Sequence, residues 1–244
     1  MTDQLDKLVY VLWGPEGRAP RAHREVLLGD VAPALLRGGA ERLQVNIADD
    51  LADVPSPAPK VLFDEPACAQ VNAYVDDPTE RRFALEDAMR AAGYEVAGYR
   101  VDEQIYTEYG GNRHSGPRDW PDGERSPGVL AVTLMERPKR LSYDEWIRRW
   151  HGRQSPVSEA MQPRARYVRN VVLEPITPGA PPFEGIVEED WPSAKHVTDP
   201  YLFYGATNPL ELATNMAKML ASVTAFLDLW RIRTLMMSEY FIKS

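Results

Sequence analysis

Apolar positions along the chain follow two spacings, one typical of strands and one typical of amphipathic helices. In the first half, short apolar or alternating runs predict strands at residues 7–13, 41–47, 70–75 and 94–109. Helices are predicted between them at 20–37 and 78–93, where Asp77, Pro78 and Glu80 supply an N-cap, a first-turn proline and a capping-box glutamate. The resulting order is βαββαβ.

The second half of the chain repeats this order. Its predicted strands lie at residues 129–136, 164–172, 183–189 and 232–242. A capping box of Ser142 and Glu145 opens one amphipathic helix, which we expect to end near His151. Asn208-Pro209 opens the other helix in the same way as Asp77-Pro78 does in the first half.

Proline-rich loops at 55–66 and 175–182 and proline-led helices at matching points predict an internal duplication. Each βαββαβ half has the ferredoxin-like pattern, an antiparallel sheet with two helices on one face. One such unit leaves its other sheet face bare, whereas two units packed sheet to sheet bury both faces. We therefore predict an α+β fold in which a degenerate N-terminal unit (1–110) and a C-terminal unit (128–244) form one fused barrel; two independent domains are the alternative.

A polar segment rich in glycine and proline, residues 111–127, joins the two predicted units. Connections of this length are usually functional or disordered. His114 and Trp120 would suit a lid over a cleft, and a surface linker anchored by the tryptophan is the simpler interpretation.

Composition and charge exclude several classes of protein. The 244 residues carry a net charge of −8 with no basic cluster, which disfavours binding to nucleic acid. No apolar run approaches the ~20 residues that span a bilayer, and residues 1–7 lack the basic-then-apolar order of a secretory signal. We therefore expect a cytoplasmic protein without a membrane partner. The single cysteine, Cys68, and four dispersed histidines predict neither a disulfide nor a metal site, and no glycine-rich nucleotide loop is present.

The second half resembles a known family. Three motifs carry the resemblance to the EthD family: Leu141-Ser142-x-x-Glu145-Trp146-x-x-x-Trp150-His151-Gly152, then Tyr167-x-x-Asn170, then Phe183-x-Gly185-Ile186-x-Glu188. The resemblance covers residues 129–244. The first half matches in layout alone, with Gly29-Asp30-Val31-Ala32-Pro33 where the second half has residues 152–156 and with Leu28 in place of His151.

The resemblance implies the fold of the dimeric α+β barrel superfamily, whose members usually have one unit per chain and form homodimers. Two fused units would complete the barrel within one chain, and the fused barrel could itself pair as a homodimer. Members of the family include dehydratases, decarboxylases and cyclisation or oxidation partners in aromatic and polyketide metabolism, generally without metal or organic cofactor. The founding member was found with an oxygenase system for ether degradation. Haem occurs in distant branches of the superfamily, and His151 is the candidate ligand for it here.

His151 is the first candidate for chemistry. Near the C-terminal end of a helix, the dipole favours the imidazolium form of the ring. A histidine that titrates near neutral pH can serve as a general acid or base. The structural alternative is a histidine hydrogen-bonded to backbone at a helix end.

The carboxylates Glu188 and Glu239 lie in apolar stretches of two predicted strands. A buried carboxylate must be paired or have a raised pKa, so either residue could orient His151 or act as the base. Residues 188–190 are also a plain acidic run, of which one should face solvent. An arginine partner such as Arg166 is the structural alternative.

Candidate substrate-binding residues are Tyr167, Asn170, Trp150, Trp191 and Tyr240. Tyr167 and Asn170 fall on opposite faces of an ideal strand, so at most one should point into a cleft, where it could donate to a carbonyl or enolate oxygen. Trp150 shares a helix face with Trp146, and such a stripe is most often core.

These observations predict a cofactor-independent enzyme that acts by proton transfer on a small apolar molecule, aromatic or polyketide-like. His151 would be the acid or base, Glu188 or Glu239 would orient it, and Tyr167 or Asn170 would stabilise an enolate. Dehydration, decarboxylation, cyclisation, other lyase chemistry and oxygen activation by a substrate carbanion all fit this scheme. The competing hypothesis is a non-catalytic protein that binds a hydrophobic ligand or supports an oxygenase.

Overall fold

The computed structural model describes residues 5–58 and 65–244, and all of the predicted strands are present in it. Part of the first proline-rich loop, residues 59–64, lies outside the described residues. The strands are β1 (Asp6–Trp13), β2 (Arg42–Ile47), β3 (Ala69–Val75), β4 (Glu95–Thr107), β5 (Val129–Met135), β6 (Arg166–Pro175), β7 (Gly185–Trp191) and β8 (Arg233–Lys243).

Helices separate the strands at the predicted places. The first half contains α1 (Pro20–Val26), the π-helical turn η1 (Leu27–Val31), α2 (Ala32–Arg37) and α3 (Pro78–Ala91). The second half contains α4 (Tyr143–Arg149), the π-helical turn η2 (Trp150–Gln154), α5 (Ser155–Glu159), α6 (Lys195–Thr198), α7 (Pro200–Phe203) and α8 (Pro209–Phe226). The short helices α6 and α7 have no counterpart in the predicted pattern.

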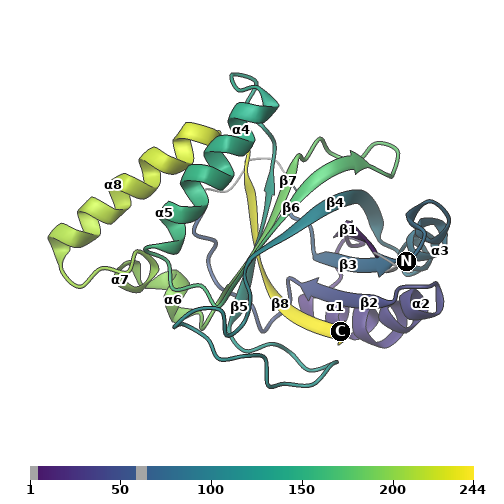
Figure 1. Ribbon diagram of the computed structural model, residues 1–244. Coiled ribbons are helices and arrows are strands. Elements are labelled where there is room, and N and C mark those ends of the chain that lie inside the picture. Colours follow the sequence, from purple (N-terminus) through teal and green to yellow (C-terminus); the bar gives the residue numbers. More distant parts are fainter. Residues whose placement is uncertain (1–4, 59–64) are drawn as a thin grey trace.

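The strands form a closed antiparallel barrel with the order β1-β3-β2-β8-β5-β7-β6-β4. The first half supplies the block β4-β1-β3-β2 and the second half supplies β8-β5-β7-β6. The pairs β2–β8 and β4–β6 join the blocks, so the barrel closes within one chain. The helices of the two halves cover opposite sides of the barrel (Figure 1).

The predicted helix caps are present. Asp77 accepts hydrogen bonds from the backbone N–H groups of Thr79 and Glu80, and Asn208 accepts one from that of Glu211. The Ser142 side chain accepts a hydrogen bond from the backbone N–H of Glu145 at 3.3 Å. In a capping box the Glu145 carboxylate would accept from the backbone N–H of Ser142 in return. Here it pairs instead with two nearby arginines of α4. These caps anchor the N-terminal ends of α3, α4 and α8.

The helix that carries His151 does not end there, and that prediction was wrong. It continues through η2 into α5, and the first half has the matching succession α1, η1, α2. Each π-helical turn precedes a proline at the second position of the next helix, Pro33 or Pro156. A proline in an uninterrupted α-helix would clash with the carbonyl four residues earlier, and the wider turn accommodates it. Leu28 and His151 hold the same place in the two turns.

The barrel interior is apolar toward one end. Alternate residues of strands from both halves meet there, so this cluster joins the two units. Its largest members include Val9, Tyr99, Leu130, Ile186 and Met237, each fully buried.

The other end of the interior contains a buried polar network centred on Glu188. Its carboxylate accepts from Asn170 Nδ2 at 2.8 Å, from Asn72 Nδ2 at 3.0 Å and from Gln70 Nε2 at 3.1 Å, and Lys7 Nζ lies 3.4 Å away. Burial alone would raise the pKa of Glu188, but the Lys7 and Arg166 cations outweigh it and hold the pKa below its usual value. The lowered pKa favours the ionised form of the Glu188 carboxyl.

Glu239 belongs to the same network. It accepts from Tyr109 Oη at 2.6 Å and Gln44 Nε2 at 2.8 Å, and Arg166 Nη1 lies 3.4 Å away. Burial raises the pKa of Glu239, and burial together with the Glu239 charge raises that of Asp190 well above its usual value. Arg166 thus supplies the arginine partner that the sequence suggested as the structural alternative.

Removing one charge from this network should cost far more stability than removing an exposed one. Arg166→Met leaves two buried carboxylates without their shared cation and should lower the free energy of unfolding by about 3–5 kcal/mol. Arg148→Met breaks an exposed pair with Glu145 and should cost at most about 1 kcal/mol. Urea unfolding of both variants measures the difference, and equal losses would contradict a tightly coupled interior.

Candidate functional site

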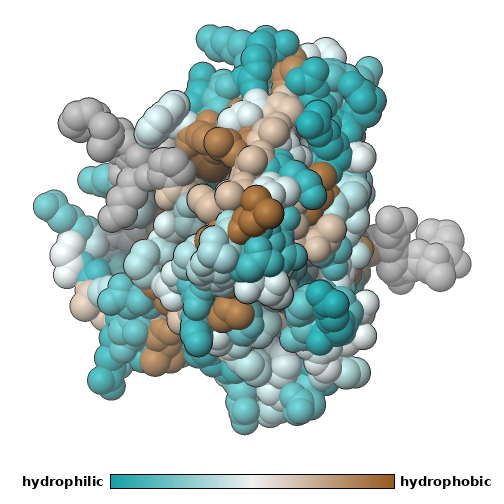
Figure 2. Space-filling view, turned by 90° about the vertical axis from the view of Figure 1, so that its left-hand side faces the viewer, coloured by the Kyte–Doolittle hydropathy of each residue, from teal (hydrophilic) through white to brown (hydrophobic). Residues whose placement is uncertain are grey.

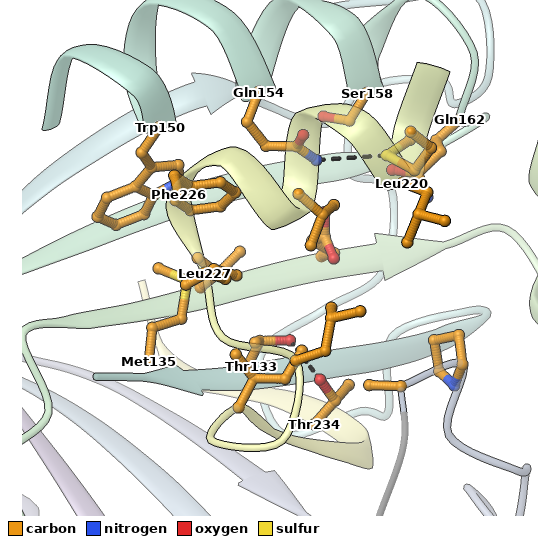
Figure 3. A pocket seen from close by; sticks show the side chains of 18 of the residues that line it. Thr133, Met135, Trp150, Gln154, Ser158, Gln162, Leu220, Phe226, Leu227 and Thr234 are labelled. Atoms are coloured by element: carbon orange, nitrogen blue, oxygen red, sulfur yellow. Dashed lines mark hydrogen bonds between the residues drawn. The ribbon is translucent and has the colours of Figure 1, made fainter. Parts of the chain in front are cut away.

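A cavity of about 260 Å³ lies between the outer face of the second-half sheet and the helices η2, α5, α7 and α8, and Pro57 and Ala58 of the first half also line it (Figure 3). We call it the α8 cavity. Most of its wall is apolar, and its polar side chains are Thr133, Gln154, Ser158, Gln162, Tyr167, Glu189, Tyr204 and Thr234. Because the barrel interior is filled by the two clusters described above, this cavity is the candidate ligand site.

The first half fills the equivalent space with a tyrosine. Tyr10 of β1 pairs with Val71 and Gly98, as Thr133 of β5 pairs with Val187 and Thr234. The Tyr10 ring is fully buried in the first-half core. The much smaller Thr133 side chain leaves room above the second-half sheet, where its hydroxyl hydrogen-bonds to Thr234 Oγ1 at 2.9 Å.

The α8 cavity has an apolar end and a polar end. Met135, beside the buried Trp150 and Phe226, forms the apolar end. Glu189 pairs with Ala131, four residues before Met135 on β5, so it lies about 13 Å away along the strand direction. A ligand in the cavity therefore meets rings and aliphatic chains at one end and polar groups at the other.

Tyr167 and Glu189 form the polar end, and they face each other across β6 and β7. The Arg164 guanidinium lies 4.0 Å from the centre of the Tyr167 ring and donates to Glu189 Oε1 at 2.5 Å. Arg164 is fully buried and also donates to Ser158 and Glu159. Burial raises the pKa of the Tyr167 phenol, and the Arg164 cation only partly offsets this, so the hydroxyl stays protonated.

Of the predicted substrate-binding residues, Tyr167 and Trp150 line the α8 cavity, and Asn170 points into the barrel, where it donates to Glu188. As predicted, the side chains of Tyr167 and Asn170 lie on opposite faces of β6. Trp191 lies behind the wall, stacked on Phe203 with ring centres 4.9 Å apart. Tyr240 lies in the first-half core and donates to Asp49 Oδ2 at 3.2 Å.

The predicted catalytic residues are not brought together. Glu188 and Glu239 lie inside the barrel, whereas His151 lies in the helix layer outside it and is not part of the cavity wall. His151 packs edge-on against Trp150, with ring centres 4.7 Å apart. A shared catalytic role for His151, Glu188 and Glu239 stays a prediction. In the structure each of the three side chains has different neighbours.

His151 is uncharged at neutral pH. Its Nε2 atom is buried and has no hydrogen-bond partner among the described residues. Burial and the nearby Arg169 cation lower the pKa of the ring to about 4. The expected stabilisation of the imidazolium by a helix C-terminus is therefore wrong, because the helix continues past His151 and supplies no free carbonyl groups there.

The residue that sequence analysis missed is Glu189. In the run 188–190, strand alternation sends Glu188 and Asp190 into the barrel and Glu189 to the outer face, the face of Tyr167. Of the three acidic residues only Glu189 has a partly exposed side chain, at 21%, which agrees with the expectation that one of them faces solvent, and it also pairs with Arg164. The alternation of side chains along the strand can be predicted from the sequence. The sequence does not show which face of the strand borders a cavity.

The connecting segment 111–127 runs along β8. The N–H groups of Gly123 and Ser126 donate to the backbone of Phe241 and Glu239, and Trp120 donates to Ser126 Oγ at 3.1 Å. Its described residues do not line the α8 cavity. The Trp120 ring packs edge-on against Tyr109, with ring centres 5.0 Å apart.

The outer surface beside the cavity is apolar as well. Figure 2 shows apolar side chains gathered on the face that carries α8, where Leu210, Met216 and Leu220 are exposed. Leu220 is 56% exposed and also lines the α8 cavity, so the cavity opens to solvent beside this residue.

Residues 5–58 and 65–244 contain neither a metal-binding cluster nor a membrane-spanning helix. No three histidine, cysteine, aspartate or glutamate side chains gather there in a way that could hold a metal ion. Among the same residues, no helix combines the length and apolar character needed to cross a bilayer.

The fold, a closed eight-stranded antiparallel barrel with helices outside it, has counterparts among solved structures. No family model and no curated protein matches the chain. Among solved structures, it is similar to an anthrone oxidase-like protein, with a TM-score of 0.57 and 10% identity over 98% of this chain and 94% of that one. A chlorite dismutase from Candidatus Nitrospira defluvii covers 98% of this chain and 92% of its own, at a TM-score of 0.49 and 7% identity. At these identities the likeness concerns the fold alone.

The low pKa of His151 predicts a pH-dependent stability. A histidine titrates near 6.5 in the unfolded chain and His151 near 4 in the folded one, so between these values the unfolded chain binds the extra proton and stability falls as the pH falls. NMR titration of the ring should give a midpoint well below 6.5. His151→Gln should remove part of the loss of unfolding free energy between pH 6.5 and 4, and a midpoint at 6.5 would show a solvated ring instead.

Proposed function

We propose that this protein is a cofactor-independent enzyme that transfers protons to and from a small apolar molecule, aromatic or polyketide-like, bound in the α8 cavity. The observation that carries the proposal is a largely apolar cavity whose wall includes Tyr167 and the arginine-paired Glu189, which lie opposite each other in the strand register. This is the usual composition of a small-molecule site: apolar walls with a few convergent polar groups.

The size of the cavity supports an aromatic ligand of a few rings. A dry cavity of about 150 Å³ accommodates benzene, and pockets for drug-sized ligands begin at about 300 Å³. The α8 cavity, at about 260 Å³, lies between these values. Trp150 and Phe226 at the apolar end suit the faces and edges of flat rings.

The polar end supports proton transfer next to a carbonyl group. Glu189 can accept a proton from the carbon beside a ligand carbonyl, and Tyr167 can donate a hydrogen bond to the enolate oxygen that forms. The Arg164 cation beside both groups favours negative charge at this end. The same arrangement serves dehydration, decarboxylation and cyclisation, because each passes through an enolate or a related anion.

The roles first considered for His151, Glu188 and Glu239 belong to an alternative proton-transfer scheme. The two glutamates would have to leave hydrogen-bonded positions inside the barrel to reach a ligand in the α8 cavity. The neutral ring of His151 packs against Trp150. For His151 to reach a ligand in the α8 cavity, Trp150 would have to move when the ligand binds.

We further propose that the two halves are tandem ferredoxin-like units and that residues 128–244 form an EthD-like unit. The support is the shared strand order, β4-β1-β3-β2 and β8-β5-β7-β6, and the matching positions of η1 and η2. The capped helix α4 and the tryptophan and histidine of η2 are the elements that carry the resemblance.

Haem does not fit the α8 cavity. Haem iron is held by histidine, by cysteine, by methionine together with histidine, or by an ionised tyrosine. Neither histidine nor cysteine lines the described wall, and burial raises the pKa of Tyr167 and Tyr204, which keeps both phenols protonated. His151, the candidate ligand, lies behind Trp150.

A second candidate function is non-catalytic binding of a hydrophobic ligand, or support of an oxygenase. The apolar outer surface around α8 favours it, because a partner or a hydrophobic ligand could approach there. The two functions differ in whether a bound ketone exchanges its protons.

Filling the cavity should abolish ligand binding. Val223→Trp places a large ring in the α8 cavity and should weaken binding of the probe 2-acetylnaphthalene at least about tenfold, as measured by calorimetry. Leu210→Trp adds the same ring at a position of α8 that is 78% exposed and should leave binding unchanged. Binding that survives Val223→Trp would mean that the probe occupies another site.

Proton transfer can be measured without the natural substrate. In D₂O, the protein should speed exchange of the methyl protons of 2-acetylnaphthalene, followed by NMR. Glu189→Gln should slow the exchange about 10²-fold or more. Glu159→Gln removes the other carboxylate on Arg164, lies outside the cavity wall and should leave the rate unchanged. Tight binding with exchange no faster than in buffer would favour the binding-protein function.

A further inference from the structure

We infer that Gln162 selects the ligand of the α8 cavity by pairing with a group that holds a hydrogen-bond donor and an acceptor side by side, as a primary or cyclic carboxamide does. The inference rests on the proposed function, because it adds the chemical class of the ligand's polar group to an aromatic site. Its basis is an accessible amide in the cavity wall whose two polar atoms are both unpaired.

The side chain of Gln162 is buried but unpaired. The residue is 6% exposed and lines the α8 cavity (Figure 3). Neither its Oε1 atom nor its Nε2 atom has a hydrogen-bond partner among the described residues, and neither belongs to the fully buried atoms that lack one. Both atoms are therefore accessible, and because the residue is part of the wall, a ligand in the cavity can reach them.

The backbone holds this amide in place. The Gln162 N–H donates to the Ser158 carbonyl at 2.7 Å, and the Gln162 carbonyl receives the N–H of Arg164 at 2.9 Å. Gly205 packs against the same segment, since a Cβ atom at Gly205 would lie 2.3 Å from the carbonyl oxygen of Met161. A side chain that projects from a fixed backbone loses less conformational freedom when a ligand binds to it.

The duplication shows that the wall of the α8 cavity is polar where the first half has an apolar core. Counted from Pro33 and Pro156 and along the paired strands, four buried apolar residues of the first half are matched by four polar wall residues of the second: Val31 by Gln154, Leu35 by Ser158, Leu43 by Tyr167 and Ala73 by Glu189. By the same count Gln162 stands where the first half has Gly39, which has no side chain. Unpaired polar groups destabilise a fold, so their placement in this wall favours a ligand that pairs with them.

The chemistry of the amide specifies the ligand group. A ligand that covers Gln162 excludes water from both polar atoms, and any buried donor or acceptor left unpaired weakens binding. A ketone receives a hydrogen bond from Nε2 but leaves Oε1 unpaired. A carboxamide presents its own donor and acceptor with the same spacing as the glutamine amide and can pair with both. A carboxylate has no donor, and Glu189 already places a negative charge in the wall.

Two compounds of the same shape test the inference. 2-Naphthamide carries the carboxamide, and 2-acetylnaphthalene has a methyl group in place of the NH₂ group. In calorimetry with the full chain, the amide should bind about tenfold more tightly than the ketone, the usual effect of one well-placed hydrogen bond. Without a partner for its N–H groups the amide should bind no better than the ketone, because it is more costly to desolvate.

One variant and one matched control assign the effect to Gln162. Gln162→Met keeps the length of the side chain and removes both polar atoms, so it should erase the advantage of the amide. Gln154→Met makes the same change at another glutamine of the wall. Gln154 Nε2 already donates to Met219 Sδ at 3.3 Å and its Oε1 atom is buried, so this variant should keep the advantage (Figure 3). Each comparison is between two probes on one variant, so a general loss of stability does not produce this pattern.

The outcomes separate this inference from the proposed function. If neither compound binds the unaltered protein, the proposed function fails. If both compounds bind equally, or if the advantage of the amide survives Gln162→Met, the inference fails while the cavity remains an aromatic site. Loss of the advantage in Gln154→Met as well would overturn the assignment to Gln162.

Discussion

Closure of the barrel is the constraint on which the rest of the structure depends. Once eight strands join edge to edge, every strand has one face inside and one face under the helices, and successive residues must alternate between them. The acidic run at 188–190 demonstrates the consequence. Glu188 and Asp190 enter a sealed interior, and Glu189, between them, reaches the wall of a cavity that is open to solvent.

The interior and the helix layer therefore have different functions. Inside the barrel, Lys7 and Arg166 neutralise buried carboxylates, and amide side chains complete the hydrogen bonds of Glu188. Most of its polar atoms are paired, although Asn170 Oδ1 and Asp190 Oδ2 are buried without a partner among the described residues. The helix layer of the second half has unfilled volume and partly occupied polar groups, which are the conditions for binding a ligand.

The two halves share a framework but not a site. Both have a π-helical turn followed by proline, and both have the same strand order. The difference lies in single side chains: Tyr10 fills the space that Thr133 leaves open, and Leu28 stands where the second half has His151. The first half is therefore filled at the place where the second half keeps a cavity.

The sequence by itself determined the local features: the eight strands, the proline-led helices with their caps, the order in which they follow one another, and the opposite faces of Tyr167 and Asn170. These depend on contacts between near neighbours, and their periodicity is visible in the order of residues. Tertiary structure alone decided that Glu188 and Glu239 meet Lys7, Arg166 and Tyr109, since these residues lie up to 181 positions apart in the chain. It also decided that Glu189 and Tyr167 line the same cavity. A cavity forms where side chains from several separate elements leave space between them, and no local sequence pattern predicts this.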